Sequence, residues 1–164
     1  MNEKVLMQVL NEALLDEYKA RDTYRKIINT FGAVRPFVNI VEAEQRHIEF
    51  LLPLYQKYSI PLPPEPDPEQ IVVPESLMEA CKAGVAEEIE NVSMYDRLIE
   101  MTDLPDVIEV LQRLQAASRD NHLPAFQRCV ERGGETGNGR GRGRLSGEGR
   151  GPGRGPGRGR RGNN

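Results

Sequence analysis

The sequence predicts an all-α protein, a four-helix bundle followed by a C-terminal tail of different composition. Apolar residues recur every three or four positions through four long stretches of the first 132 residues. This is the period of a helix that buries one face. The same part of the chain is rich in helix formers and holds only 2 of the 16 glycines, which argues against an all-β or Rossmann-type fold.

The first two predicted helices form an antiparallel pair. The first carries an apolar seam at spacings of 4 and 3 residues up to Phe31 and is ended by Gly32. The second opens near Pro36 and continues the same rhythm to Tyr58, with a kink or local break expected at Pro53. Because only about four or five residues separate the two helices, we expect them to pack against each other as a hairpin.

A proline-rich segment from Ile60 to Pro74 separates the two pairs of helices. Its prolines forbid a helix and favour an extended, stiff path, which suits a crossover along the long side of a bundle. Ser76 and Glu79 form a capping box that starts the third helix. We expect that helix to run to about Met101.

The fourth predicted helix follows the short turn at 102–105 and ends at Gly133. Pro124 is expected to kink it in its second half. A short, a long and a short connection give two antiparallel hairpins joined by one crossover, which is the ferritin-like arrangement of the four-helix bundle. We therefore predict a bundle domain over residues 1–132 and a separate tail over residues 133–164.

Polar side chains interrupt the apolar seam in the middle of every predicted helix. A buried carboxylate without a partner is costly, so four helices that share this feature indicate a common cause. At ~1.5 Å rise per residue, these positions fall in the central third of the bundle. Four carboxylates and two imidazoles around one interior volume are the ligand set of a two-metal site, and they suit iron or manganese. The predicted metal ligands are Glu17, Glu44, His47, Glu87, Glu90 and His122.

These residues lie in motifs that resemble a known superfamily. Three motifs resemble those of rubrerythrin-type members of the ferritin-like superfamily. They are Glu17-x-x-Ala20-x-x-x-Tyr24, Glu44-x-x-His47 and Glu87-x-x-Glu90-x-x-x-x-Tyr95. The chain more closely resembles an uncharacterised prokaryotic ferritin-like family, which is known mainly as a domain of unknown function. The segments that carry this resemblance are Asp16-Glu17-Tyr18, the Glu44-x-x-His47 helix and Asn121-His122-Leu123-Pro124-Ala125-Phe126. The resemblance covers about residues 5–132. It implies a bundle with a dinuclear site and no settled activity.

The fourth helix departs from the ferritin-like pattern, which has a second Glu-x-x-His motif there. His122 has no carboxylate three or four residues before it, where Arg119 and Ser118 stand. Three interpretations are open: the two predicted glutamates of the third helix both reach inward and compensate, the site holds one metal ion, or it binds metal weakly. Glu88 is a further ligand candidate, because the third helix is apolar around a wide arc.

The predicted site indicates a chemical class. Two iron ions, or iron with manganese, held by carboxylates suit peroxide reduction or ferroxidation. We therefore predict an oxidoreductase or a metal-handling protein, and a peroxidase of this type needs a separate electron donor. The alternative is a non-enzymatic helical binding protein, in which the polar cluster is only a hydrogen-bonded core and the tail engages the partner. These two hypotheses leave open whether the chain is an enzyme.

Composition bears on location and partners. No apolar run approaches the ~18 residues of a membrane-spanning helix, and the N-terminus lacks the pattern of a signal peptide. We expect a cytoplasmic protein with no membrane partner. Cys81 and Cys129 form no metal or redox motif and are expected to be buried free thiols. Bundles of this kind often pair, but no exposed apolar stripe in the sequence is distinctive enough to predict a dimer, so a homodimer is left open.

The tail differs from the bundle in charge. Its 32 residues carry a net charge of +6, against −9 for residues 1–132. We expect such an Arg/Gly repeat to be disordered, and similar segments bind nucleic acid through phosphate contacts. The tail has no aromatic residue for base stacking, so the other interpretation is that it folds back on its own domain or on a neighbour. The arginines predicted to contact nucleic acid are Arg140, Arg142, Arg144, Arg150, Arg154 and Arg158.

Overall fold

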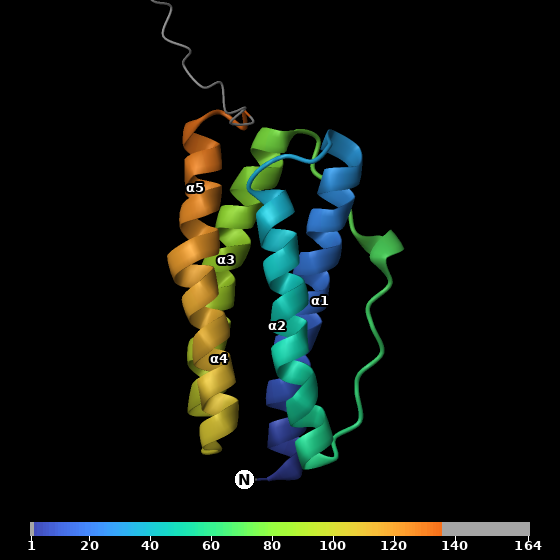
Figure 1. The fold of residues 1–164 in the computed structure, drawn as a ribbon, viewed down its shortest axis with the longest axis vertical. Helices are drawn as coiled ribbons and strands as arrows, with labels where there is room; N and C mark the ends of the chain where they lie inside the picture. The colour runs from blue at the N-terminus through green and yellow to red at the C-terminus, as the bar shows by residue number, and fades with distance from the viewer. Residues whose placement is uncertain (1, 136–164) are drawn as a thin grey trace, which may run out of the picture.

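The computed structural model describes residues 2–135 and shows a four-helix bundle, as predicted (Figure 1). Residues 2–135 contain no strand, and none of their helices is long and apolar enough to cross a membrane. The predicted tail arginines, from Arg140 to Arg158, lie outside the described residues. The elements are α1 (Glu3–Phe31), α2 (Phe37–Tyr58), a short 3-10 turn (Pro68–Gln70), α3 (Leu77–Glu100), α4 (Pro105–Ala117), a π-helical turn (Ser118–His122) and α5 (Leu123–Glu131).

Helices α1 and α2 form the first antiparallel hairpin. Asn2 caps α1 by accepting a hydrogen bond from a backbone N–H two residues on, at 2.9 Å. Gly32 ends α1 with a φ of 89°, a conformation that side chains disfavour. The local break considered at Pro53 does not occur, since α2 continues through it to its end. Burial of Leu51 and Leu54 on either side holds this stretch against the rest of the bundle.

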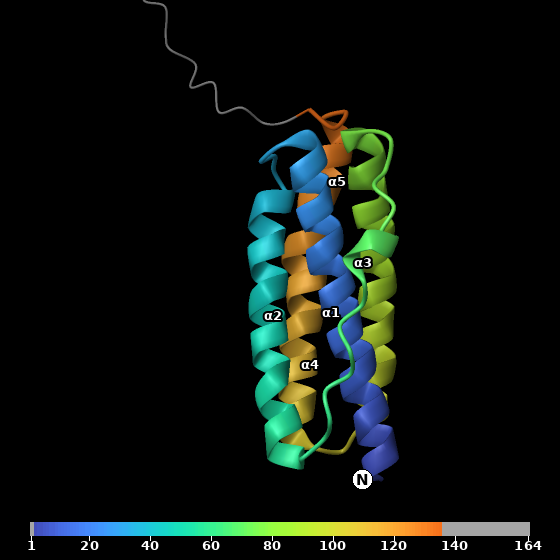
Figure 2. The ribbon, with the colours of Figure 1, turned by 90° about the vertical axis from the view of Figure 1, so that its right-hand side faces the viewer.

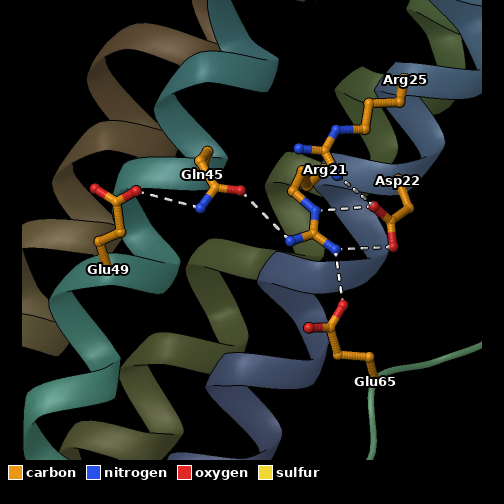
Figure 3. A network of polar contacts seen from close by, with 6 residues as sticks. All are labelled: Arg21, Asp22, Arg25, Gln45, Glu49 and Glu65. Atoms are coloured by element: carbon orange, nitrogen blue, oxygen red, sulfur yellow. Dashed lines mark hydrogen bonds and ion pairs between the residues drawn. The ribbon is translucent and has the colours of Figure 1, made fainter.

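The extended crossover between α2 and α3 runs along α1 (Figure 2) and is tied to it by a buried arginine. The Arg21 Nη2 atom lies 3.1 Å from Glu65 Oε2 in the crossover, and Nε lies 2.8 Å from Asp22 Oδ1. Its Nη1 atom donates to Gln45 Oε1 on α2 at 3.4 Å (Figure 3). One guanidinium group therefore joins two helices and the crossover.

The second hairpin pairs α3 with α4 and α5. Helix α3 starts at the predicted cap, where Ser76 Oγ accepts a hydrogen bond from the Glu79 N–H at 3.2 Å. Just before Pro124, where a kink was predicted, the helix contains the π-helical turn. Pro124 lies in the first turn of α5, directly after the π-helical turn, and has no N–H to donate to a carbonyl of that turn.

The interior of the bundle contains two apolar clusters with a polar layer between them. The first cluster includes Leu14, Leu51 and Leu111 and lies in the half of the bundle that contains the N-terminus. The second is built around three aromatic rings whose centroids lie 5.3, 5.5 and 5.7 Å apart. These rings belong to Tyr24, Phe37 and Phe126.

Cys81 and Cys129 are joined by a disulfide, so the expectation of two free thiols was wrong. The bond links α3 to α5 over a sequence separation of 48 residues, with a Cα–Cα distance of 5.9 Å. Both cysteines are fully buried in the second apolar cluster. Their pairing depends on the register of two antiparallel helices, which no local spacing in the sequence reports.

Candidate metal centre

Five buried ionisable side chains meet between the two apolar clusters. None of them is more than 6% exposed. Helices α1, α2 and α3 and the π-helical turn all contribute, so each of the four long stretches predicted from the sequence supplies at least one group. The five residues are Glu17, Glu44, His47, Glu88 and His122.

Glu44 lies at the centre of this polar layer, with one carboxylate oxygen facing each histidine. Its Oε2 atom is 2.8 Å from Nδ1 of His47, and its Oε1 atom is 3.3 Å from Nδ1 of His122. The two imidazole rings are stacked, with centroids 5.4 Å apart. Donor atoms of these three residues all lie within 4.8 Å of one another. A carboxylate placed in this way has the arrangement of a bridging ligand between two cations.

Each histidine has a second carboxylate beside it. Glu17 Oε2 lies 3.1 Å from Nδ1 of His47. Glu88 Oε1 lies 3.4 Å from Nδ1 of His122. The polar layer therefore consists of two similar halves, each with one outer glutamate and one histidine, and the halves share Glu44.

Two buried tyrosines orient the outer glutamates across the bundle. Tyr95 on α3 donates a hydrogen bond to Glu17 on α1. In the opposite sense, Tyr24 on α1 donates to Glu88 on α3 at 3.4 Å. Burial, and then the nearby carboxylates, raise the pKa of both hydroxyls well above the ordinary value, which keeps them as donors. On each helix the tyrosine follows the glutamate by seven residues, so α1 and α3 supply equivalent pairs.

The Nδ1 atom of His122 is buried and has no hydrogen-bond partner within residues 2–135. It nevertheless faces the oxygens of Glu44 and Glu88 at 3.3 and 3.4 Å. Unsatisfied buried nitrogen atoms are rare in folded proteins and call for an explanation. A cation bound between this nitrogen and the two carboxylates supplies one, because imidazole nitrogen and carboxylate oxygen are both metal donors. The residues present therefore fit a metal ion.

Burial and mutual contact set the charges of the metal-free layer. Burial, reinforced by the neighbouring Glu44, raises the pKa of Glu17 to about 8. Burial by itself would raise the pKa of Glu44, but contacts with His122 and His47 lower it to about 2. Burial also opposes the charged form of both histidines, yet their carboxylate neighbours raise the pKa of His47 to about 9 and that of His122 to about 10. In the metal-free layer, protons on Glu17 and on both histidines therefore offset the negative charge of the carboxylates.

Glu87 and Glu90, predicted as ligands, lie outside the polar layer. Glu90 is exposed, and Glu87 is half-buried with its Oε1 atom 3.5 Å from Nζ of Lys19. Glu88 points inward instead, on the buried face of α3 that also carries Tyr95. A sequence signal was available for Glu88: the seven-residue spacing to Tyr95 repeats the spacing of the first helix.

The two residues that stand where the ferritin-like pattern has a second bridging carboxylate are Ser118 and Arg119, both in the π-helical turn. Ser118 is buried, and its Oγ donates to Asn91 Oδ1 at 3.0 Å. Arg119 is exposed and pairs with its neighbour Asp120 at 2.8 Å. The fourth stretch of helix therefore contributes His122 alone to the polar layer.

A hollow of about 180 Å³ between α1 and α3 reaches the polar layer. Glu44 and Glu88 form part of its lining, and so do the more exposed Glu87 and Glu90. Asp16 lines it as well, and burial raises the pKa of that carboxyl to about 6. Glu87 and Glu90 thus lie where this acidic hollow meets the surface.

Comparison with known proteins places the chain in a family. Residues 70–140, which include Glu88 and His122, match the family described as "Uncharacterized protein domain (DUF2202)". The chain is also similar to "Uncharacterized protein MJ0754" of Methanocaldococcus jannaschii, with 31% identity over 134 residues that cover 73% of this chain and 71% of the relative. The chain belongs to the DUF2202 family. The resemblance to an uncharacterised family is thereby confirmed, and kinship with rubrerythrins stays a prediction.

A solved structure shares the fold of this DUF2202 protein. The crystal structure of hypothetical protein MJ0754 from Methanococcus jannaschii has a TM-score of 0.71 and 28% sequence identity, and covers 83% of this chain and 85% of that chain. The likeness therefore extends over most of both proteins. Both matches are to MJ0754, whose description names no function, so function must be argued from the polar layer.

Proposed function

We propose that this protein binds two transition-metal ions, iron or manganese, in the polar layer of its bundle. The arrangement of Glu44, with its two oxygens facing separate buried imidazoles, carries the proposal. One ion would be held by Glu17, Glu44 and His47. The other would be held by Glu44, Glu88 and His122. Carboxylate oxygens with one nitrogen for each ion suit iron or manganese better than softer metals.

The unpartnered Nδ1 of His122 favours metal binding over a purely structural role. A hydrogen-bonded core selected for stability would satisfy this atom, and replacing buried charges with apolar residues is often neutral or stabilising. Three glutamates and two histidines are costly to bury without a ligand. The cost of burying these groups weighs against the hypothesis that the polar layer is only a hydrogen-bonded core.

Bound iron or manganese supplies one-electron redox chemistry toward dioxygen or peroxide, so we propose an oxidoreductase or metal-handling activity of the peroxidase or ferroxidase type. The protein residues hold the site. Tyr95 and Tyr24 orient the outer glutamates, and the apolar clusters flank the layer on both sides along the bundle. The acidic hollow between α1 and α3 gives cations a route to Glu44 and Glu88. A separate electron donor belongs to the peroxidase form of the proposal.

Metal content in matched variants tests this proposal. The full chain is purified from cells supplemented with iron or manganese and analysed for bound metal. We expect two ions per chain in the wild type, little metal in Glu44→Gln, and wild-type metal in Glu90→Gln. The control changes the same group on the exposed part of α3. Equal metal in the two variants would contradict the proposed site.

A further inference from the structure

A second hollow reaches the polar layer from the opposite side, between α2 and the stretch formed by α4 and the π-helical turn. Its volume is about 400 Å³, which falls in the range of small-molecule sites. His47 and His122 line it, together with Arg46 and Arg113. The described lining contains no aspartate or glutamate, although residues 1–132 carry a net charge of −9. This hollow is therefore a basic site on an acidic domain.

Both arginines of the hollow have free guanidinium groups within the described chain. Four other arginines of the described chain, outside the hollow, do form ion pairs: Arg21, Arg25, Arg97 and Arg119. Arg113 is nevertheless held in place, because its Cζ atom lies 3.9 Å from the centroid of the Phe50 ring. Stacking of this kind fixes the plane of the guanidinium group and leaves its N–H groups available.

The two histidines contribute ring edges to the lining. Each turns Nδ1 toward Glu44, and Nε2 lies on the far side of the ring from Nδ1, so it is directed away from that carboxylate. Because both rings line the hollow, Nε2 is the ring nitrogen left to face it. Which ring nitrogen carries a proton depends on the charge of the ring, since a neutral imidazole has one N–H group and the imidazolium cation has two. The part of the lining that is cationic in every state of the polar layer is therefore the arginine pair, with the two imidazole edges beside it.

We propose that this hollow binds a small free oxoanion of the inorganic phosphate class, held by the guanidinium groups of Arg46 and Arg113 beside the imidazole edges of His47 and His122. Arginine N–H groups match the oxygens of such an anion, and charge-assisted hydrogen bonds of this kind are among the stronger ones. The site goes beyond the proposed metal function and does not require that function, since both arginines are present and charged without metal.

Nuclear magnetic resonance of the full chain labelled with ¹⁵N-histidine tests the site. The chain has only two histidines, and both line the hollow, so their Nε2 signals report on it without interference from the tail arginines. Metal-free protein is titrated with inorganic phosphate, against sodium chloride at equal ionic strength. We expect a saturable shift of both Nε2 signals with phosphate. Arg46→Gln and Arg113→Gln should each weaken binding about tenfold.

Arg128→Gln is the matched control, because it removes the same charge from an exposed position of α5 outside the hollow. It should leave the phosphate affinity unchanged, and the histidine spectrum verifies that each variant is folded. No saturable shift, or equal weakening in Arg113→Gln and Arg128→Gln, would overturn the proposal. Phosphate binding by a protein that takes up no metal would support this site and refute the proposed function. Metal uptake without phosphate binding would do the reverse.

Discussion

The polar layer and the apolar clusters on either side of it are buried to a similar degree but affect stability in opposite ways. Leu51 and Leu111 are 0% exposed, and Glu17 and Glu44 are 2% and 3% exposed. Burying a leucine side chain stabilises the fold by roughly 1.5–3 kcal/mol, whereas burying a carboxylate is unfavourable unless a partner compensates. The clusters therefore hold the bundle together, and the cost of burying the layer is consistent with the proposal that it binds metal.

The largest effect on stability is expected in the second apolar cluster, from removal of its disulfide. A cross-link over a sequence separation of 48 residues lowers the conformational entropy of the unfolded chain. On the chain-entropy model this loss stabilises the folded state by roughly 4 kcal/mol. Urea unfolding of the Cys81→Ala/Cys129→Ala variant measures the loss. Bound metal per folded chain should not change. A loss below about 1 kcal/mol would show that this cluster does not depend on its cross-link.

A cavity in the first apolar cluster is expected to have the next largest effect. Leu111→Ala should lower the free energy of unfolding by roughly 3 kcal/mol, through lost burial and the cavity left behind. Leu62→Ala is the control, because Leu62 is 56% exposed and should have almost no effect. Calorimetry of both variants measures the difference. Loss of metal from folded Leu111→Ala protein would contradict the separation between clusters and layer.

Replacing the whole polar layer with apolar residues sharpens the comparison further. In this variant methionine replaces the three glutamates, leucine the two histidines, and phenylalanine both Tyr24 and Tyr95, so that no hydroxyl is left unpaired. The metal-free variant should be as stable as metal-free wild type, or more stable by about 1–3 kcal/mol. It should bind no metal. Marked destabilisation in urea would mean that the layer is a structural element after all.

The elements of this bundle could largely be predicted from the sequence, because the signals are local. Gly32 and Ser76 mark helix ends by their own backbone preferences, and the apolar period reports burial directly. The face of α3 could not be fixed in the same way, because apolar residues surround much of that helix. Only packing against α1 selects Glu88 over Glu87, and only helix register brings the two cysteines together.

The metal-free layer should also respond to pH, with a smaller effect. Glu17, His47 and His122 have pKa values of about 8, 9 and 10, all raised above their ordinary values. The folded state therefore binds these protons more tightly than the unfolded chain, and metal-free stability should fall as pH rises through this range.

The affinity of the same layer for metal should change with pH in the opposite direction to the metal-free stability. A metal must displace these protons, so affinity should rise between about pH 6 and pH 8. Calorimetric titration with Mn²⁺ in buffers of different ionisation enthalpy measures the protons released. Binding without proton release would contradict the assignment of the histidines as ligands.

Anomalous X-ray scattering from crystals of the full chain grown with Mn²⁺ tests the central claim most directly. Data collected near the manganese absorption edge locate the metal independently of the protein coordinates. We expect two anomalous peaks beside Glu44, one toward Nδ1 of His47 and one toward Nδ1 of His122. A polar layer with no anomalous peak, its groups paired only with one another or with water, would contradict it.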